Sequence, residues 1–219
     1  NNYLFFCFII DLYNIDMNEL EYPLKTQLYN EYFPELEELL LEYHNKKTKI
    51  TVGNRLNLSA DGSRLKSLCL GVRGPFFLAI RKDKTLNPHL TKHTQTEKGH
   101  EIYKLIYTII GMVFPDFQFN SIIVNFNSNF LIHKDSKNVN TDSVMFTVGD
   151  HEGGGLHLYN DEKELIETKH IDKYPIRFSG KTTYHSTEEF TGTRYCIVAY
   201  QTAPKYHYDP FEKEIYKLK

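Results

Sequence analysis

The residues with the clearest capacity for chemistry are two histidines and one aspartate in the last third of the chain, His133, Asp135 and His185. Two imidazoles and one carboxylate can occupy one face of an octahedral iron(II) ion and leave three positions open. Arg194 follows the second histidine closely, and its guanidinium can hold a carboxylate through paired charge-assisted hydrogen bonds. This order of residues predicts an iron(II) centre with an anion-binding arginine beside it.

The His-x-Asp pattern occurs at residues 133–135, 170–172 and 207–209. No histidine follows His207, so this one cannot begin a triad of the required order. His170 could use His185, which leaves too little chain to fold around a metal, or His207, which leaves no arginine downstream. Only the pattern that begins at His133 completes the set.

The chain around His133 favours a strand followed by extended chain that presents the ligands. Residues 121–127 are rich in Ile, Val and Phe and alternate in polarity, which predicts a strand. A turn at residues 128–129 follows, and residues 130–135 are expected to return as extended chain. Side chains two apart in extended chain point the same way, so His133 and Asp135 can reach one ion.

Other short apolar runs, bounded by turn residues, surround this segment. The strands predicted from them are 143–148, 156–159, 164–168, 174–178 and 194–200. Many short strands at close spacing favour a double-stranded β-helix, the jelly-roll barrel. We therefore expect an α+β fold that is mainly β, with His185 and Arg194 on neighbouring strands near the mouth of the barrel.

Two helices are predicted upstream of the barrel and are expected to buttress it. Residues 34–43 begin with a proline, carry acidic side chains near the start and place apolar residues at helical spacing. Residues 96–113 show the same spacing, opened by Thr96 or Glu97 as a cap.

Five segments carry a resemblance to a known family: 114–127, 133–135, 149–156, 184–185 and 192–198. They resemble the dioxygenase domain of the thymine hydroxylases that begin base J synthesis and of the TET methylcytosine oxidases. The likeness covers roughly residues 110 to 202. The Phe-Pro lead-in, the Asn-x-Asn before the first ligand and the glycine-rich turn point to this nucleic-acid-modifying group within the Fe(II)/2-oxoglutarate oxygenase superfamily.

The resemblance implies iron(II), 2-oxoglutarate and dioxygen as metal, co-substrate and oxidant. It makes His133, Asp135 and His185 the iron ligands, and with Arg194 they form the catalytic set. Arg194 is implied to hold the far carboxylate of 2-oxoglutarate. The function that this predicts is hydroxylation of a substrate C–H bond.

Three further residues near this set have open roles. Asn125 and Asn127 could donate hydrogen bonds to 2-oxoglutarate, or could serve only the turn that follows them. Many relatives have Arg-x-Ser at the 2-oxoglutarate site, where this chain has Arg194-Tyr-Cys196. A thiol is a poorer hydrogen-bond partner than a hydroxyl, so Cys196 is interpreted as a packing residue.

The leading substrate prediction is the methyl group of a pyrimidine in DNA, thymine or 5-methylcytosine. Residues 55–104 hold ten Lys/Arg and four Asp/Glu, a surface for phosphates or an ordinary solvated loop. A base must be flipped or already unpaired to reach the iron. Phe76, Phe77 and Tyr184 are candidates for stacking on it, with core packing favoured for the two phenylalanines. The alternatives are a protein (prolyl-type) or small-molecule hydroxylase and, outside enzymes, an inactive jelly-roll binding module.

Composition sets wider limits. The 219 residues, 41% hydrophobic, suffice for one globular unit. The divisions expected within it are a non-native or disordered start at 1–16, an N-terminal extension at 17–110, the catalytic jelly-roll at 111–205 and a C-terminal tail at 206–219. Three dispersed cysteines favour a reducing, intracellular compartment, nuclear or cytoplasmic. The apolar run near the start is far shorter than the roughly 20 residues that cross a bilayer, so no membrane partner is expected.

The remaining histidines are weaker candidates. His151 precedes three glycines in a predicted hairpin loop, where exposure is favoured over a substrate contact. His157 alternates with two leucines and is expected to face outward from a strand. His89, His93 and His100 have no cysteines at zinc-ligand spacing and are expected in a solvated loop.

Overall fold

The computed structural model describes residues 23–45, 51–52, 58–60, 62, 65–72, 89–135, 138, 142–202 and 206–217. The predictions made for residues 1–16, for Phe76 and Phe77, and for much of the basic stretch lie outside these residues.

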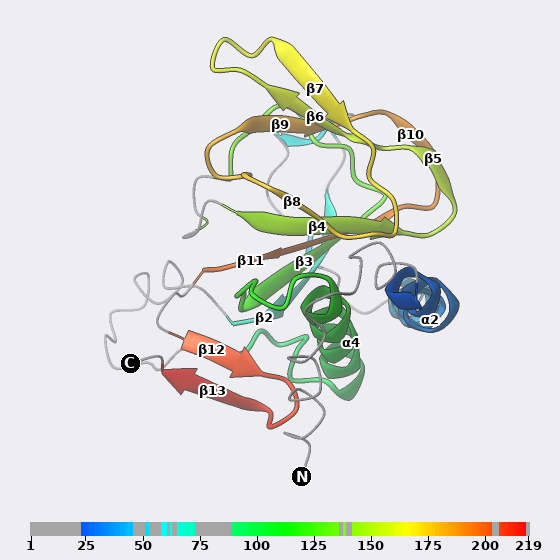
Figure 1. Ribbon diagram of the computed structural model, residues 1–219, viewed down its shortest axis with the longest axis vertical. Coiled ribbons are helices and arrows are strands. Elements are labelled where there is room, and N and C mark those ends of the chain that lie inside the picture. Colours follow the sequence, from blue (N-terminus) through cyan, green and yellow to red (C-terminus); the bar gives the residue numbers. More distant parts are fainter. Residues whose placement is uncertain are drawn as a thin grey trace, which may run out of the picture.

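A six-stranded antiparallel sheet forms the centre of the molecule (Figure 1). In this sheet β11, which comes late in the chain, lies between β3 and β4. The last strand of the predicted barrel therefore pairs with its first two strands. In order across the sheet the strands are β1 Thr51–Val52, β2 Lys66–Gly71, β3 Ser121–Phe126, β11 Tyr195–Tyr200, β4 Ser143–Val148 and β8 Ile176–Phe178. The strands predicted near 121–127, 143–148, 174–178 and 194–200 are thereby confirmed.

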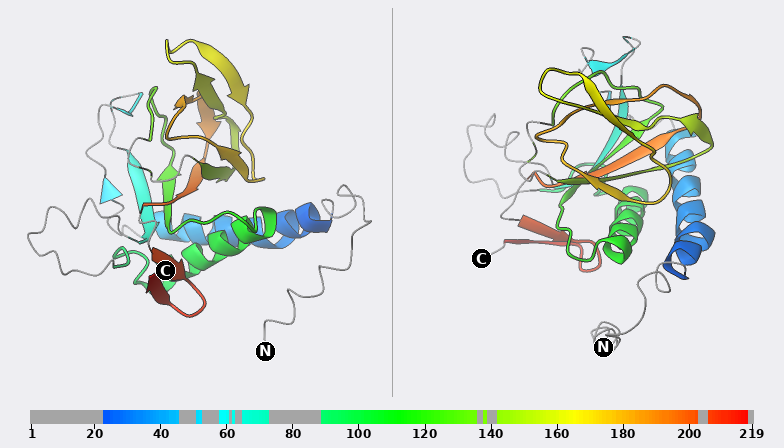
Figure 2. Two further views of the ribbon diagram at one scale, coloured as in Figure 1. Left: turned by 60° about the vertical axis from the view of Figure 1, so that its left-hand side comes forward. Right: turned by 45° about the horizontal axis from the view of Figure 1, so that its top comes forward.

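A second layer of strands lies over one face of this sheet (Figures 1 and 2). Apolar side chains fill the space between the layers, among them Met145, Leu158, Phe178 and Val198. Two facing antiparallel layers are consistent with a jelly-roll-like fold. The strands of this layer are β7 Leu165–Lys169, β6 Leu156–Tyr159 and β9 Tyr184–Thr187 in one sheet, and β5 His151–Gly153 and β10 Phe190–Gly192 in a ribbon.

Two helices cover the other face of the six-stranded sheet, as predicted (Figure 2). Residues 23–27 are helical, η3 Leu28–Tyr32 is a π turn, and α2 Phe33–Asn45 continues from it. The Phe33 ring packs on Phe146 of β4, with 6.0 Å between ring centroids. α4 Glu97–Val113 is capped by Thr96, whose hydroxyl accepts the Gly99 N–H at 3.1 Å.

The structure differs from the predicted divisions of the chain in two places. β2, from the predicted N-terminal extension, pairs with β3 along its whole length and is part of the sheet itself. Residues beyond 205 form a hairpin of β12 Tyr206–Asp209 and β13 Glu214–Lys217, with Tyr208 buried against Tyr103 of α4. Both segments are held by packing onto elements far away in sequence, which local composition does not reveal.

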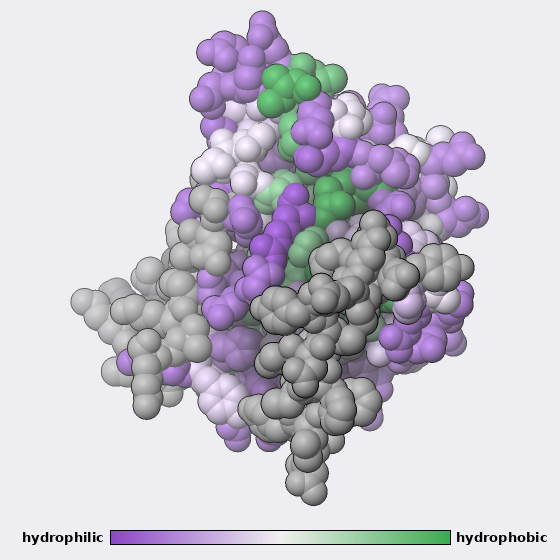
Figure 3. All heavy atoms as spheres, in the orientation of Figure 1, coloured by the Kyte–Doolittle hydropathy of each residue, from purple (hydrophilic) through white to green (hydrophobic). Residues whose placement is uncertain are grey.

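The surface in Figure 3 is mostly hydrophilic, with an apolar patch in the region of β7. Leu165 and Ile166 of this edge strand are 54% and 63% exposed. Among the described residues, no helix combines the length and apolarity needed to cross a bilayer.

Candidate metal centre

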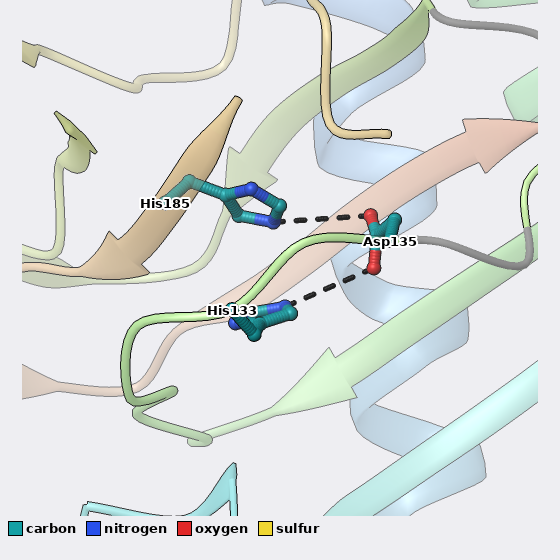
Figure 4. A group of neighbouring side chains, drawn as sticks. All are labelled: His133, Asp135 and His185. Atoms are coloured by element: carbon teal, nitrogen blue, oxygen red, sulfur yellow. Dashed lines mark ion pairs between the residues drawn. The ribbon is translucent and has the colours of Figure 1, made fainter. Parts of the chain in front are cut away.

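The fold brings His133, Asp135 and His185 together in one cluster (Figure 4). The His133 Nε2 lies 3.8 Å from Asp135 Oδ1, and the His185 Nε2 lies 3.8 Å from Asp135 Oδ2. The centroids of the two imidazole rings are 4.3 Å apart. Within the described part of the chain, no other group of three such side chains converges in this way.

Backbone hydrogen bonds hold the three residues of the cluster in position. His133 and His185 form an antiparallel bridge, in which each backbone N–H donates to the other residue's carbonyl at 2.9 Å. Asp135 donates its N–H to the Gly180 carbonyl at 2.9 Å. A Cβ on Gly180 would stand 3.0 Å from Asp135 Oδ2 and 2.8 Å from the Phe178 ring, so a larger residue would push one of these side chains aside.

Both histidines are oriented by a backbone carbonyl two residues earlier. His133 Nδ1 lies 2.7 Å from the Leu131 carbonyl oxygen, and His185 Nδ1 lies 2.9 Å from that of Thr183. A carbonyl oxygen only accepts, so each Nδ1 carries the proton and each Nε2 presents a lone pair towards Asp135. Metal-binding histidines are typically oriented by such a bond from the second ring nitrogen.

The electrostatics also keep His185 able to bind a metal. Burial lowers the pKa of His185 below its usual value, and the neighbouring His133 lowers it further. The neutral ring is therefore favoured at neutral pH, which is the form that ligates.

The donor set and its spacing fit a divalent transition metal. The three candidate ligand atoms lie within 4.8 Å of one another. Adjacent ligands of an octahedral ion, each about 2.1 Å from it, are about 3 Å apart, so a small inward movement would complete the coordination. The three side chains come from two segments, 133–135 and β9, and would supply three ligands to a bound ion, whose other positions would remain for other ligands.

Arg194 is buried between the layers, immediately before β11, with 3% of its surface exposed. Its Nη2 donates to the Gly154 carbonyl at 2.7 Å, and its guanidinium lies 5.3 Å from the centroid of the Phe190 ring. Its Nε has no hydrogen-bond partner among the described residues. A buried, unpartnered donor on a cation costs free energy unless an anion completes it.

The expectation that His185 and Arg194 lie on neighbouring strands is wrong. His185 belongs to β9 in the upper layer, whereas Arg194 leads into β11 in the six-stranded sheet. β10 lies between them in the chain and pairs with β5, so the two strands are not neighbours in a sheet. The two side chains therefore approach the interior from opposite layers.

The glycine-rich turn makes room for the arginine. Gly154 has φ +79°, and a Cβ there would lie 2.5 Å from Arg194 Nε and 2.7 Å from its Cδ. Any larger residue would displace the guanidinium. Gly154, the middle glycine of the three, thus has a structural purpose at the candidate anion site.

The two asparagines occupy different positions. Asn125 of β3 is buried and faces the interior, where its Oδ1 accepts from the Ser67 hydroxyl at 2.8 Å. Asn127 lies beyond the end of β3 with φ +45°, and its Oδ1 accepts the Arg194 backbone N–H at 2.7 Å. Contact with a co-substrate stays a prediction for both.

Ser67 and Thr147 were not singled out from the sequence, and Cys196 was interpreted only as a packing residue. Ser67, Thr147 and Cys196 lie on β2, β4 and β11, and cross-strand pairing aligns Thr147 and Ser67 with Cys196 through β11 and β3. Burial raises the pKa of the Cys196 thiol, and the adjacent Arg194 opposes this effect. Their alignment depends on strand register, which a single sequence does not give.

Lysines surround Tyr184, the residue before the second histidine. The Lys134 ammonium lies 4.1 Å from the centroid of the Tyr184 ring, and that of Lys163 lies 5.5 Å from it. Lys134 also pairs with Asp161 at 3.0 Å. Tyr184, a candidate for base stacking, is therefore half-buried beside two cations.

Comparisons with known proteins give structural neighbours only. No family model and no curated protein matches the chain. NgTET1, solved in complex with 5mC DNA, has a TM-score of 0.49 at 14% identity, covering 80% of this chain and 68% of that one. A prolyl-4-hydroxylase from Pseudomonas putida has 0.43 at 9%, covering 80% and 94%. A 2OG-Fe(II) oxygenase family protein from Burkholderia pseudomallei has 0.42 at 13%, covering 62% and 66%. Function must therefore be inferred from the side chains of the site.

Proposed function

We propose that the chain is an Fe(II)/2-oxoglutarate-dependent dioxygenase whose two layers form a double-stranded β-helix. The observation that carries this proposal is the convergence of His133, Asp135 and His185, with both imidazoles oriented through Nδ1 so that Nε2 is available. Two histidines and one carboxylate with open positions opposite them are the ligand set of non-haem iron(II) oxygenases.

In this proposal the three side chains hold iron(II) and the protein supplies orientation. Bound iron(II) supplies the activation of dioxygen that C–H hydroxylation requires. The Leu131 and Thr183 carbonyls hold the two rings, and the Gly180 backbone holds Asp135. The apolar residues between the layers exclude water from the reacting centre.

Arg194 is proposed to bind the far carboxylate of 2-oxoglutarate. A carboxylate would satisfy its unpartnered Nε and neutralise a buried cation. Asn125 can add a donor from its amide nitrogen, since its oxygen is already engaged by Ser67. Asn127 is proposed to act through Arg194, whose backbone it anchors.

The proposed substrate is a pyrimidine methyl group in DNA. The sequence resemblance to thymine and methylcytosine oxygenases supports this choice, as does the grouping of Lys134 and Lys163 on the ring of Tyr184, the residue before the ligand His185. Cations beside an aromatic side chain are suited to the phosphates and bases of an unpaired strand. The balanced reaction is conversion of methyl, 2-oxoglutarate and O2 to hydroxymethyl, succinate and CO2.

The test is an assay for coupled turnover. Oligonucleotides that contain thymine or 5-methylcytosine are compared with matched ones that contain uracil or cytosine, and with proline-containing peptides. We expect succinate and a product one oxygen atom heavier only with methylated bases. Hydroxylated product from the peptides would indicate that the substrate is a protein and not DNA. Absence of any 2-oxoglutarate turnover with iron(II) present would overturn the proposal.

A further inference from the structure

His151 is a second polar group at the anion side of the interior, and the proposed function does not use it. The predicted exposed hairpin loop is wrong here: His151 begins β5, is half-buried, and its Nε2 lies 3.1 Å from the hydroxyl of Thr147, which is fully buried on β4. Its Nδ1 lies 3.1 Å from the Gly153 carbonyl oxygen. The next carbonyl, that of Gly154, accepts from Arg194. One short turn thus contacts both side chains.

A neutral His151 imidazole cannot satisfy all the hydrogen bonds that join His151, Thr147 and their carbonyl partners. The Gly153 carbonyl only accepts, so His151 Nδ1 must donate. The Thr147 hydroxyl has one proton, and it is directed to the Ile171 carbonyl at 3.2 Å. Its oxygen then needs a donor from His151 Nε2. All three bonds form together only when both ring nitrogens carry protons; the neutral ring instead takes the Thr147 proton and leaves Ile171 without that bond.

Charged groups around His151 set when the second proton binds. Burial lowers the pKa of His151, and Arg194 from the start of β11 and His170 after β7 lower it further. The Gly153 carbonyl and Asp150 on its own segment act in the opposite direction. Glu152 and Asp150 border the same surface cavity of about 230 Å³ together with Thr191 of β10. The dominant cation facing His151 is therefore Arg194, the group proposed to receive a carboxylate.

We propose that His151 takes up a proton when a dicarboxylate binds at Arg194, so that co-substrate binding and protonation of His151 are linked. This proposal rests on the proposed function, because it needs an anion at Arg194. The carboxylate cancels the repulsion that Arg194 exerts on the imidazolium, and the protonated ring completes its bonds to Gly153 and Thr147. His151 acts as a positioning residue that adds a second positive charge to the anion site only in the bound state.

The sign of the linkage follows from the two states. The pKa of His151 is below its usual value in the free protein and is higher in the complex, so protons strengthen binding. The added affinity is complete below the free-state pKa and is lost as pH rises through the bound-state pKa. The extra charge-assisted contacts correspond to about a tenfold gain in affinity.

The experiment is calorimetric titration of 2-oxoglutarate into the full chain loaded with Mn(II), which binds without turnover. Titrations at each pH from 6 to 8.5, in two buffers that do not bind the metal and differ in their enthalpy of ionisation, give the number of protons taken up and the pH dependence of Kd. We expect an uptake of about 0.5 proton per 2-oxoglutarate midway between the free-state and bound-state pKa of His151, the most that a tenfold linkage allows, with uptake falling towards zero at higher pH. His151→Gln should bring it close to zero and weaken binding about tenfold at low pH, with little difference at high pH.

Three variants make the result specific. Thr147→Val should reduce proton uptake, whereas Thr147→Ser, which keeps the hydroxyl, should restore it. His207→Gln, on the distant hairpin, is the matched control and should leave uptake unchanged. Binding without proton uptake, or equal uptake in His151→Gln, would overturn this proposal and leave the dioxygenase assignment intact. No binding of 2-oxoglutarate at all would overturn both.

Discussion

The two faces of the six-stranded sheet are made by alternate residues of the same strands, and both are largely apolar, but the face towards the second layer also carries buried polar side chains of the site. On β3, Ile122 and Val124 face the helices, whereas Asn125 faces the second layer. On β11, Ile197 joins the core under α2 and α4, whereas Cys196 packs between the layers. Figure 2 shows the helices on one side of the sheet and the strand layer on the other.

Within each strand of the sheet, the residues that face the helices stabilise the fold, and some residues that face the second layer form the site. The helix-facing side is apolar apart from tyrosine hydroxyls and buries large side chains, which favours folding by roughly 1.5–3 kcal/mol for each fully buried one. The inner side holds polar groups that are matched to one another, such as Ser67 with Asn125 and Thr147 with Ile171. Side-chain alternation lets a well-packed apolar face hold the polar side chains of the opposite face in place.

The largest change in the free energy of unfolding is expected when a side chain on the helix-facing side is truncated. Ile197→Ala removes a fully buried side chain from β11 and should reduce the free energy of unfolding by about 2–5 kcal/mol. Because Ile197 points away from the site, turnover per folded molecule should stay within about twofold of wild type. Chemical denaturation and an activity assay on the same samples measure both. A large loss of turnover in fully folded protein would show that the faces are not independent.

The opposite pattern is expected on the inner side. Arg194→Gln removes the cation and should raise the KM for 2-oxoglutarate about ten- to a hundredfold, since charge-assisted bonds contribute about 1.5–3 kcal/mol each. Stability should change less than in Ile197→Ala, because the free protein loses a buried guanidinium whose Nε was unpartnered. Steady-state kinetics with varied 2-oxoglutarate provide the measurement, and an unchanged KM would remove Arg194 from this role.

The smallest effect on the KM for 2-oxoglutarate is expected from a substitution of Cys196, which lies beside Arg194. Cys196→Ser restores the Arg-x-Ser pattern of many relatives and replaces the buried thiol beside Arg194 with a hydroxyl. Arg194 can donate to this hydroxyl, so the KM for 2-oxoglutarate should change by less than about threefold. The same kinetic series measures it. A tenfold decrease in KM would show that Cys196 limits co-substrate binding and is more than a packing residue.

The parts of the molecule that could be predicted are those that depend on local patterns. β4 and β6 were placed at their observed bounds, and α2 and α4 within a few residues, because alternation and helical spacing are properties of the local chain. The metal cluster could be predicted because only one His-x-Asp pattern had a histidine and an arginine correctly placed after it.

The parts that could not be predicted depend on distant partners. β2 reads as a short polar-flanked run, and only its pairing with β3 makes it a strand of the sheet. The inward orientation of His151 depends on the pairing of β5 with β10 and on the position of Thr147. The placement of His185 and Arg194 on opposite layers follows from the crossover of strands between sheets. Non-local register determines all three.

The most direct test of the central claim, that the inner side holds one metal ion through His133, Asp135 and His185, is titration of metal-free protein with Co(II), followed by its visible absorption. We predict one ion per chain for wild type, with affinity at least a hundredfold weaker in Asp135→Asn, beyond the 10–100-fold typical for residues around a ligand. The surface control Asp116→Asn, which pairs with Arg177, should bind as wild type does. Equal affinity in wild type and Asp135→Asn, or no binding by either, would contradict the account.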